Sequence, residues 1–221
     1  MTGWPITRRS LMAGASAAAL VPAGVMAALP ASSLPPSAKP LPLAQVRLLP
    51  SPYLDAVEGN LRYLHLLEPD RLLHNFRTSA KLRPKGAVYG GWESDTIAGH
   101  SLGHYLTALA LMHEQTGDAE CRRRIDYIVG ELAEVQAAHG DGYVAGFTRK
   151  TKDGVVEDGK VLFPELMAGD IRSMGFDLNG CWVPLYNWHK LYDGLFAAAD
   201  VMVLPSATNA LSRIHPEASR A

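Results

Sequence analysis

Apolar residues recur at helical spacing in five stretches of this chain, and segments rich in glycine and proline separate them. Ser51-Pro52 is a favourable helix start, because serine caps free backbone N–H groups and proline fits the first helical position. Gly117-Asp118 ends one helix and caps the next. We expect the five helices to begin near Pro52, Asp70, Thr96, Ala119 and Cys181.

Two of these helices differ in how much of their surface is apolar. The helix from about Thr96 to Gln115 has few charges on any side, so we expect it to be buried nearly all round. The helix from about Ala119 to Ala138 is amphipathic, with arginines and glutamates on its outer side. Its inward stripe consists of Cys121, Ile125, Ile128, Leu132 and Val135.

Strand signals are nearly absent, which predicts an all-α fold. The segment from Val144 to Asn179 is irregular, with one candidate hairpin at Lys152-Asp153-Gly154, and a loop this long is usually functional. Paired helices joined by loops favour a toroid of helical hairpins. A closed ring of about twelve helices needs at least roughly 240 residues, so this chain supplies about half of one. Half a ring would expose a large apolar surface.

The N-terminus has the pattern of a targeting segment. Arg8-Arg9 forms a twin-arginine pattern, and an alanine-rich stretch follows to about Leu29. A retained N-terminal anchor is the alternative to a cleaved signal. A cleaved signal implies a bacterial protein in the periplasm or secreted, without a stable membrane span. We therefore predict a signal peptide at 1–29, a proline-rich linker at 30–45, a helical domain at 46–203 and an unrelated tail at 204–221.

Composition excludes some classes of function. The chain has 221 residues, of which 48% are hydrophobic, as in globular proteins. Its net charge of −1 gives no support for binding nucleic acid. Its two cysteines, Cys121 and Cys181, form neither a disulfide framework nor a Cys-x-x-Cys metal motif.

Two segments combine turn glycines with aromatic, imidazole and carboxylate side chains. They run from Tyr89 to His104 and from Gly175 to Tyr192, and each joins a glycine-rich loop to an apolar helix. Flat aromatic faces stack on sugar rings, while carboxylates and imidazoles hydrogen-bond hydroxyl groups. The two segments therefore predict a polar pocket with aromatic walls.

From about Val46 to Asp200, the chain resembles the N-terminal part of the catalytic domain of glycoside hydrolase family 127, the β-L-arabinofuranosidase-like proteins. The motifs that carry this resemblance are Leu48-Leu-Pro-Ser-Pro-Tyr53, Asp70-Arg-Leu-Leu-His-Asn-Phe-Arg77, Tyr89-Gly-Gly-Trp-Glu-Ser-Asp95, Gly99-His-Ser-Leu-Gly-His-Tyr-Leu106, Gly140-Asp-Gly-Tyr143, Gly169-Asp170 and Cys181-Trp-Val-Pro-Leu-Tyr-Asn-Trp-His-Lys190.

The resemblance implies an (α/α)6 barrel that removes non-reducing β-L-arabinofuranose units from arabinose-containing glycans. In that family a zinc-bound cysteine thiolate is the nucleophile, and a glutamate acts as acid and base. Attack at the anomeric carbon would form a covalent glycosyl-enzyme in a retaining mechanism. The partner that the resemblance implies is therefore a carbohydrate.

The resemblance covers only the first half of the family domain, so the fold we expect is an incomplete (α/α)6 barrel. The nucleophile, the zinc ligands and the acid/base glutamate belong to the other half. Cys181 does not match the nucleophile, because it lacks an adjacent cysteine. We therefore assign no catalytic residue, metal ligand or cofactor in this chain, and zinc only to the intact family domain. The residues assigned to the substrate-binding wall are Trp92, Glu93, His104, Trp188 and His189.

Several candidate residues also have structural interpretations. His100 and His104 lie four residues apart on one helical face, where they could contact sugar, hold a metal or stabilise the core. Glu93 could line the pocket or serve the fold, and Asp95 could cap the helix that begins near Thr96. Cys181 is either structural or a thiol whose pKa is lowered by a helix N-terminus.

Four hypotheses of function follow. The first is an exported glycosidase of this family, in a truncated form that lacks hydrolytic activity. The second is a non-catalytic carbohydrate-binding remnant, and the third a degenerate product that does not fold stably. The fourth is a sugar epimerase or polysaccharide lyase on the same toroid, which would make the motifs coincidental.

Overall fold

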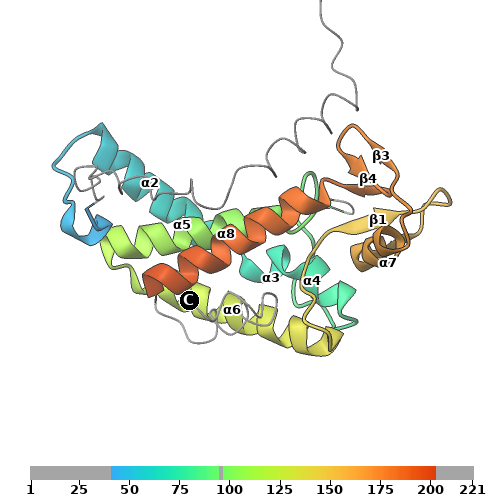
Figure 1. Cartoon of the computed structure of the whole chain (residues 1–221). Helices are drawn as coiled ribbons and strands as arrows, with labels where there is room; N and C mark the ends of the chain where they lie inside the picture. Colours follow the sequence, from blue (N-terminus) through green and yellow to red (C-terminus); the bar gives the residue numbers. More distant parts are fainter. Residues whose placement is uncertain (1–40, 95–96, 203–221) are drawn as a thin grey trace, which may run out of the picture. The chain divides into compact units, whose positions relative to one another are not determined.

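The computed structural model of this chain describes residues 41–94 and 97–202 (Figure 1). The predicted signal peptide, most of the linker, Asp95 and the tail at 204–221 lie outside the described residues. The helices are η2 (Leu43–Gln45), α2 (Pro52–Leu66), α3 (Pro69–Leu72), α4 (His74–Ser79), α5 (His100–Thr116), α6 (Ala119–His139), η3 (Gly159–Val161), α7 (Leu162–Met167) and α8 (Pro184–Met202). The strands are β1 (Thr148–Lys150), β2 (Val156–Asp158), β3 (Ser173–Met174), β4 (Asp177–Leu178) and β5 (Cys181–Trp182).

The helix caps read from the sequence are confirmed at two places. The Ser51 hydroxyl accepts a hydrogen bond from the Leu54 N–H at 3.4 Å and starts α2. Gly117 ends α5 with a φ of 73°, and Asp118 caps α6 by accepting the Cys121 N–H at 2.7 Å. Local chemistry determines these boundaries, because each cap satisfies backbone groups that the helix leaves free.

The short helix predicted after Asp70 is wrong in its boundaries. The segment forms two helices, α3 and α4, and α3 starts at Pro69 with Glu68 as its N-cap residue. Asp70 does not cap; its carboxylate accepts a hydrogen bond from the Tyr127 hydroxyl on α6. A proline at the first helical position moves the helix start one residue ahead of the acidic residue.

The core lies between α5, α6 and α8. The inward stripe predicted for α6 is buried throughout, and Leu102, Leu106 and Leu109 of α5 are fully buried against it. The expectation that α5 is buried nearly all round is wrong for the described residues. His104 is exposed, and Leu111 is 45% exposed.

Helices α5 and α8 lie side by side (Figure 1) and approach each other through two glycines. A Cβ atom on Gly103 of α5 would overlap the backbone carbonyl of Lys190. A Cβ atom on Gly194 of α8 would lie 2.5 Å from the carbonyl oxygen of Gly103. The two backbones therefore touch directly, as small residues allow at a helix contact.

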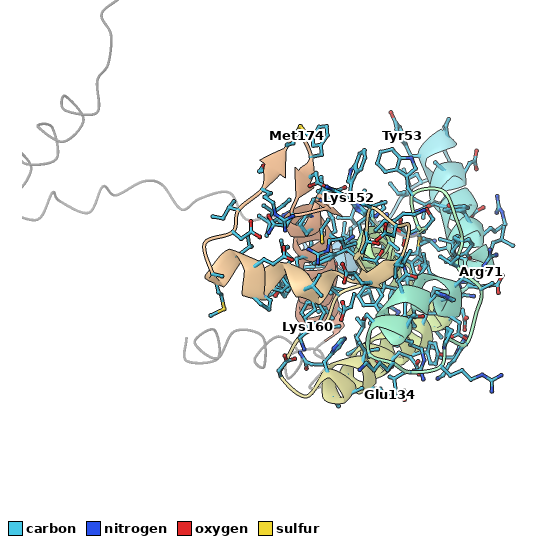
Figure 2. All side chains as sticks on the ribbon, turned by 90° about the vertical axis from the view of Figure 1, so that its right-hand side faces the viewer. Tyr53, Arg71, Glu134, Lys152, Lys160 and Met174 are labelled. Carbon is cyan, nitrogen blue, oxygen red and sulfur yellow. The ribbon has the colours of Figure 1, made fainter. Side chains whose placement is uncertain are left out.

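The all-α expectation is wrong between β1 and β5, where an antiparallel sheet forms in the order β2-β1-β5-β4-β3. The hairpin predicted at Lys152–Gly154 is confirmed as the turn between β1 and β2. The other strands have only two residues each, which is too short for an alternating pattern to identify. Met174 on β3 is 83% exposed and lies at the outer edge of the view in Figure 2.

The helix predicted to start near Cys181 begins later, at Pro184, and Cys181 belongs to strand β5. Proline at the first position again sets the start. Among the described residues, no helix is long and apolar enough to cross a membrane. The mostly helical composition is confirmed, whereas the incomplete (α/α)6 barrel stays a prediction.

Gly103→Ala is expected to lower the free energy of unfolding by roughly 1–3 kcal/mol, because the added methyl group overpacks the α5–α8 contact. Gly130→Ala is the matched control, because no described atom lies within 4 Å of the Cβ position there. Alanine at position 130 should raise the free energy of unfolding by up to about 1 kcal/mol through helix propensity. Urea unfolding compares the two variants, and equal effects would contradict a tight glycine contact.

Candidate functional site

Two polar side chains on neighbouring helices form an exposed pair. His104 lies in the second turn of α5, and Tyr186 lies in the first turn of α8. The His104 Nε2 atom and the Tyr186 hydroxyl oxygen are 3.2 Å apart. Lys190 follows one turn later, with its Nζ atom 5.6 Å from the centre of the Tyr186 ring. These groups present hydrogen-bond donors and acceptors to solvent beside otherwise apolar helices.

The electrostatic surroundings of His104 favour its neutral form. Partial desolvation, followed by the positive charge of Lys190 and the neighbouring His100 ring, lowers the pKa of His104 below its usual value. The imidazole is therefore uncharged at neutral pH. A neutral imidazole offers one donor and one acceptor, which suits hydroxyl groups of an uncharged ligand.

Glu93 does not face the predicted pocket freely, because it caps α5 from the preceding loop. It is buried, and its carboxylate accepts the Gly99 N–H at 2.9 Å and the Ser101 N–H at 3.0 Å. The His100 Nδ1 atom lies 3.0 Å from the same carboxylate and 3.0 Å from the Ile97 carbonyl oxygen. Two acceptors at Nδ1 place the His100 proton there. Of the alternatives for Glu93, the structure favours the structural one.

Asn187 holds the loop that precedes α5, and sequence reasoning missed it. Its side chain is 1% exposed, and its Nδ2 group donates to the carbonyl oxygens of Ile97 at 2.7 Å and Ala98 at 2.9 Å. These bonds connect α8 to the loop that leads into α5, just before the histidines begin. The sequence did offer a signal for this role, an amide side chain within an apolar helix, because a buried polar side chain needs hydrogen-bond partners.

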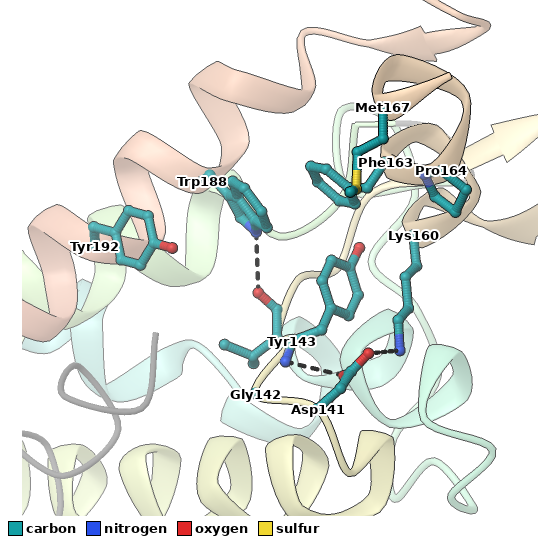
Figure 3. Close-up of a pocket in the computed structure, with 10 residues that line it drawn as sticks. Asp141, Gly142, Tyr143, Lys160, Phe163, Pro164, Met167, Trp188 and Tyr192 are labelled. Atoms are coloured by element: carbon teal, nitrogen blue, oxygen red, sulfur yellow. Dashed lines mark hydrogen bonds and ion pairs between the residues drawn. The ribbon is translucent and has the colours of Figure 1, made fainter. Parts of the chain in front are cut away.

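Trp188 lines a cavity of about 370 Å³ (Figure 3), and His104 is not among the residues that line it. Its ring stacks on Phe163 of α7, with centroids 4.7 Å apart and planes 14° apart. Its indole N–H donates to the Val144 carbonyl oxygen at 3.1 Å. The remaining lining residues are Asp141, Gly142, Tyr143, Lys160, Pro164, Met167 and Tyr192.

Polar groups occur at one edge of this aromatic cavity. Lys160 pairs with Asp141 at 2.6 Å, as Figure 3 shows, and its ammonium group lies 5.5 Å from the centre of the Tyr143 ring. Burial raises the pKa of Tyr143, so its hydroxyl stays protonated. Sequence reasoning missed Phe163 and Lys160 as site residues, because they lie in the segment interpreted as an irregular loop.

Trp92 and His189 are both exposed, as a ligand-contacting role requires. Trp92 is 71% exposed and directly precedes Glu93, the residue that caps α5. His189 follows Tyr186 by three residues on α8, which places the two side chains on the same helical face. Neither Trp92 nor His189 makes a side-chain hydrogen bond within the described part of the chain.

The two cysteines do not fit a zinc-bound thiolate nucleophile. Cys121 and Cys181 are each 0% exposed and belong to separate core clusters. Burial raises the pKa of the Cys121 thiol to about 12 and that of the Cys181 thiol to about 11. The lowered pKa considered for Cys181 is wrong, because the residue lies in a buried strand instead of at a helix N-terminus. Neither thiol is accessible to a sugar.

Lys190→Met is expected to raise the pKa of His104, because the substitution removes a positive charge that disfavours the imidazolium. Titration of the histidine ring protons by NMR measures this shift. Lys152→Met is the matched control, because Lys152 is exposed in the distant β1–β2 turn. An unchanged or lowered pKa in the Lys190 variant would contradict the assigned electrostatics.

Comparison with known protein families confirms the resemblance seen in the sequence. The family model described as β-L-arabinofuranosidase, GH127 catalytic domain, matches residues 45–212. The matched range covers most of the chain, includes both motif-rich segments and extends past residue 203. The comparison with curated proteins gave no match. This chain belongs to the GH127 catalytic-domain family of glycoside hydrolases.

Proposed function

We propose that this chain forms the sugar-binding part of a glycoside hydrolase that acts on terminal β-L-arabinofuranose units of arabinose-containing glycans. The observation that carries the proposal is the exposed pair of His104 and Tyr186 at 3.2 Å. Membership in the GH127 family supports a carbohydrate as the ligand.

The chemistry of the surrounding groups supports an uncharged, hydroxyl-rich ligand. His104 and Tyr186 supply hydrogen bonds, and His189 lies on the same face of α8. The exposed Trp92 indole offers an apolar face for a sugar ring. Glu93 is used to cap α5, so its negative charge supports the site's backbone instead of meeting the ligand. A pyranose or furanose matches this combination of polar edges and an aromatic face.

Neither cysteine of this chain can serve as the nucleophile for hydrolysis of a glycosidic bond. Both cysteines are buried and protonated, so neither can act as the thiolate that attacks the anomeric carbon. This observation favours a second candidate function, carbohydrate binding without catalysis. In both proposals the ligand is the same, and they differ only in whether a nucleophile is present.

We further propose that the protein is exported. The Arg8-Arg9 pair and the alanine-rich stretch that follows support a twin-arginine signal. Replacing both arginines with lysine in a bacterial host should shift the protein from the periplasmic fraction to the cytoplasmic fraction. An unchanged distribution on immunoblots would contradict export by this route.

Tyr186→Phe is expected to weaken binding of methyl β-L-arabinofuranoside several-fold, because one hydrogen bond contributes about 0.5–1.5 kcal/mol. Isothermal titration calorimetry measures the dissociation constant. Tyr53→Phe is the matched control, because Tyr53 is 76% exposed on α2, away from His104. Equal affinities in the two variants, or no binding by the unmodified chain, would contradict the assigned sugar site.

The purified chain of this sequence is expected to release no L-arabinose from an arabinofuranoside, because neither thiol is an accessible nucleophile. Chromatography of the released sugar measures this directly. Release at a rate above the buffer control would show that another group supplies the nucleophile, and it would overturn the binding-only candidate.

A further inference from the structure

Three side chains that commonly bind transition metals meet where α2 ends and α6 begins. His65 lies in the last turn of α2, Asp118 is the N-cap residue of α6, and Cys121 lies in the first turn of α6. One ligand atom from each residue lies within 4.8 Å of the other two. Nitrogen, oxygen and sulfur ligands around a tetrahedral zinc ion are about 3.3–3.7 Å apart, given bonds of about 2.0–2.3 Å.

Asp118 already organises this cluster. One of its carboxylate oxygens is 3.0 Å from the His65 Nε2 atom and accepts the Cys121 N–H at 2.7 Å. Its backbone carbonyl oxygen is 2.8 Å from the Nδ1 atom of His113 on α5. Groups from three helices therefore hold Asp118 in place, two through its carboxylate and one through its backbone carbonyl, so the ligands need little rearrangement to meet around an ion.

Burial and access also suit a metal ion. The Cys121 side chain is fully buried, whereas those of His65 and Asp118 are 33% and 21% exposed. An ion can therefore enter past the imidazole and the carboxylate and reach the thiol last. The nearby Arg124 guanidinium lies 2.6 Å from Glu120, a carboxylate that it shares with Arg123, so its positive charge is partly offset.

We propose that His65, Asp118 and Cys121 form a zinc site that ties the end of α2 to the start of α6, with water as the fourth ligand. The donor set of one nitrogen, one oxygen and one sulfur suits a borderline-soft divalent ion. The thiol releases its proton to solvent when zinc binds, and the carboxylate and thiolate together neutralise the ion. His65 binds through Nε2 as the neutral tautomer with its proton on Nδ1.

This site is separate from the zinc–thiolate centre that the family resemblance implies, and it does not rest on the proposed sugar binding. Its cysteine is inaccessible to a substrate, so its role is structural. The ion would hold the end of α2 against the start of α6. Sugar binding at His104 and Tyr186 can fail while this site still binds zinc, and the reverse also holds.

Titration of the purified full chain with Co²⁺, a spectroscopic substitute for zinc, tests the proposal. A cysteine ligand gives a sulfur-to-cobalt charge-transfer absorption, and we expect it in the unmodified chain. Cys121→Ser should abolish the absorption, whereas Cys181→Ser, the matched control for the other buried thiol, should retain it. No absorption in the unmodified chain, or its persistence in Cys121→Ser, would overturn the site.

Affinity and stability give independent measurements. Asp118→Asn should weaken Zn²⁺ binding at least 10-fold while keeping the α6 cap, because asparagine is a good N-cap residue. Zn²⁺ at about 100 times its dissociation constant should raise the melting temperature of the unmodified chain by roughly 5–10 °C. The same shift in His65→Gln, or none in the unmodified chain, would contradict a zinc site that joins the two helices.

Discussion

The close contact between α5 and α8 determines the geometry of the His104–Tyr186 pair. Gly103 and Gly194 have no side chains, so the backbone in the first turn of α5 touches the backbone near the middle of α8. This contact brings His104 and Tyr186, which are 82 residues apart, to within hydrogen-bonding distance. A larger residue at either glycine would separate the helices and move the two polar groups apart. The geometry of the site is therefore a consequence of backbone packing.

Two buried polar groups then orient the first turn of α5. Glu93 accepts N–H groups of that turn, and Asn187 ties the preceding loop to α8. A buried ion pair, Arg77 with Glu131 at 2.6 Å, joins α4 to α6 in a similar way. Each of these interactions satisfies groups that would be costly to bury alone. The start of α5, where the histidines lie, is thus held by buried hydrogen bonds from two sides.

The chain has three separate groups of side chains that could bind a ligand: the His104–Tyr186 pair, the aromatic cavity around Trp188, and the cluster of His65, Asp118 and Cys121. Trp188 stacks on Phe163 beside the small sheet, apart from the His104 pair. Asp118 caps α6 and also organises the candidate zinc ligands. One residue can serve both purposes because a carboxylate accepts several hydrogen bonds and also binds cations. Family membership indicates a carbohydrate-active protein, but it does not say where each of these side chains lies.

The sequence by itself determined the positions of α2 and α6, their caps at Ser51 and Asp118, the buried stripe of α6, and the family. These features depend on residues close together along the chain, so periodicity and cap chemistry suffice to predict them. His104 and Trp92 were found because their residue types signalled a polar pocket. Their role in binding sugar stays a prediction.

Only the tertiary structure decided the short strands, the capping role of Glu93, the burial of Cys181 and the separation of Trp188 from His104. Strands of two or three residues form because distant segments supply their partners, as when Arg149 of β1 pairs with Cys181 of β5. The partner of a polar side chain likewise depends on which helices touch. Such long-range contacts leave no periodic pattern in the sequence, and this is why they became visible only once the helices were packed.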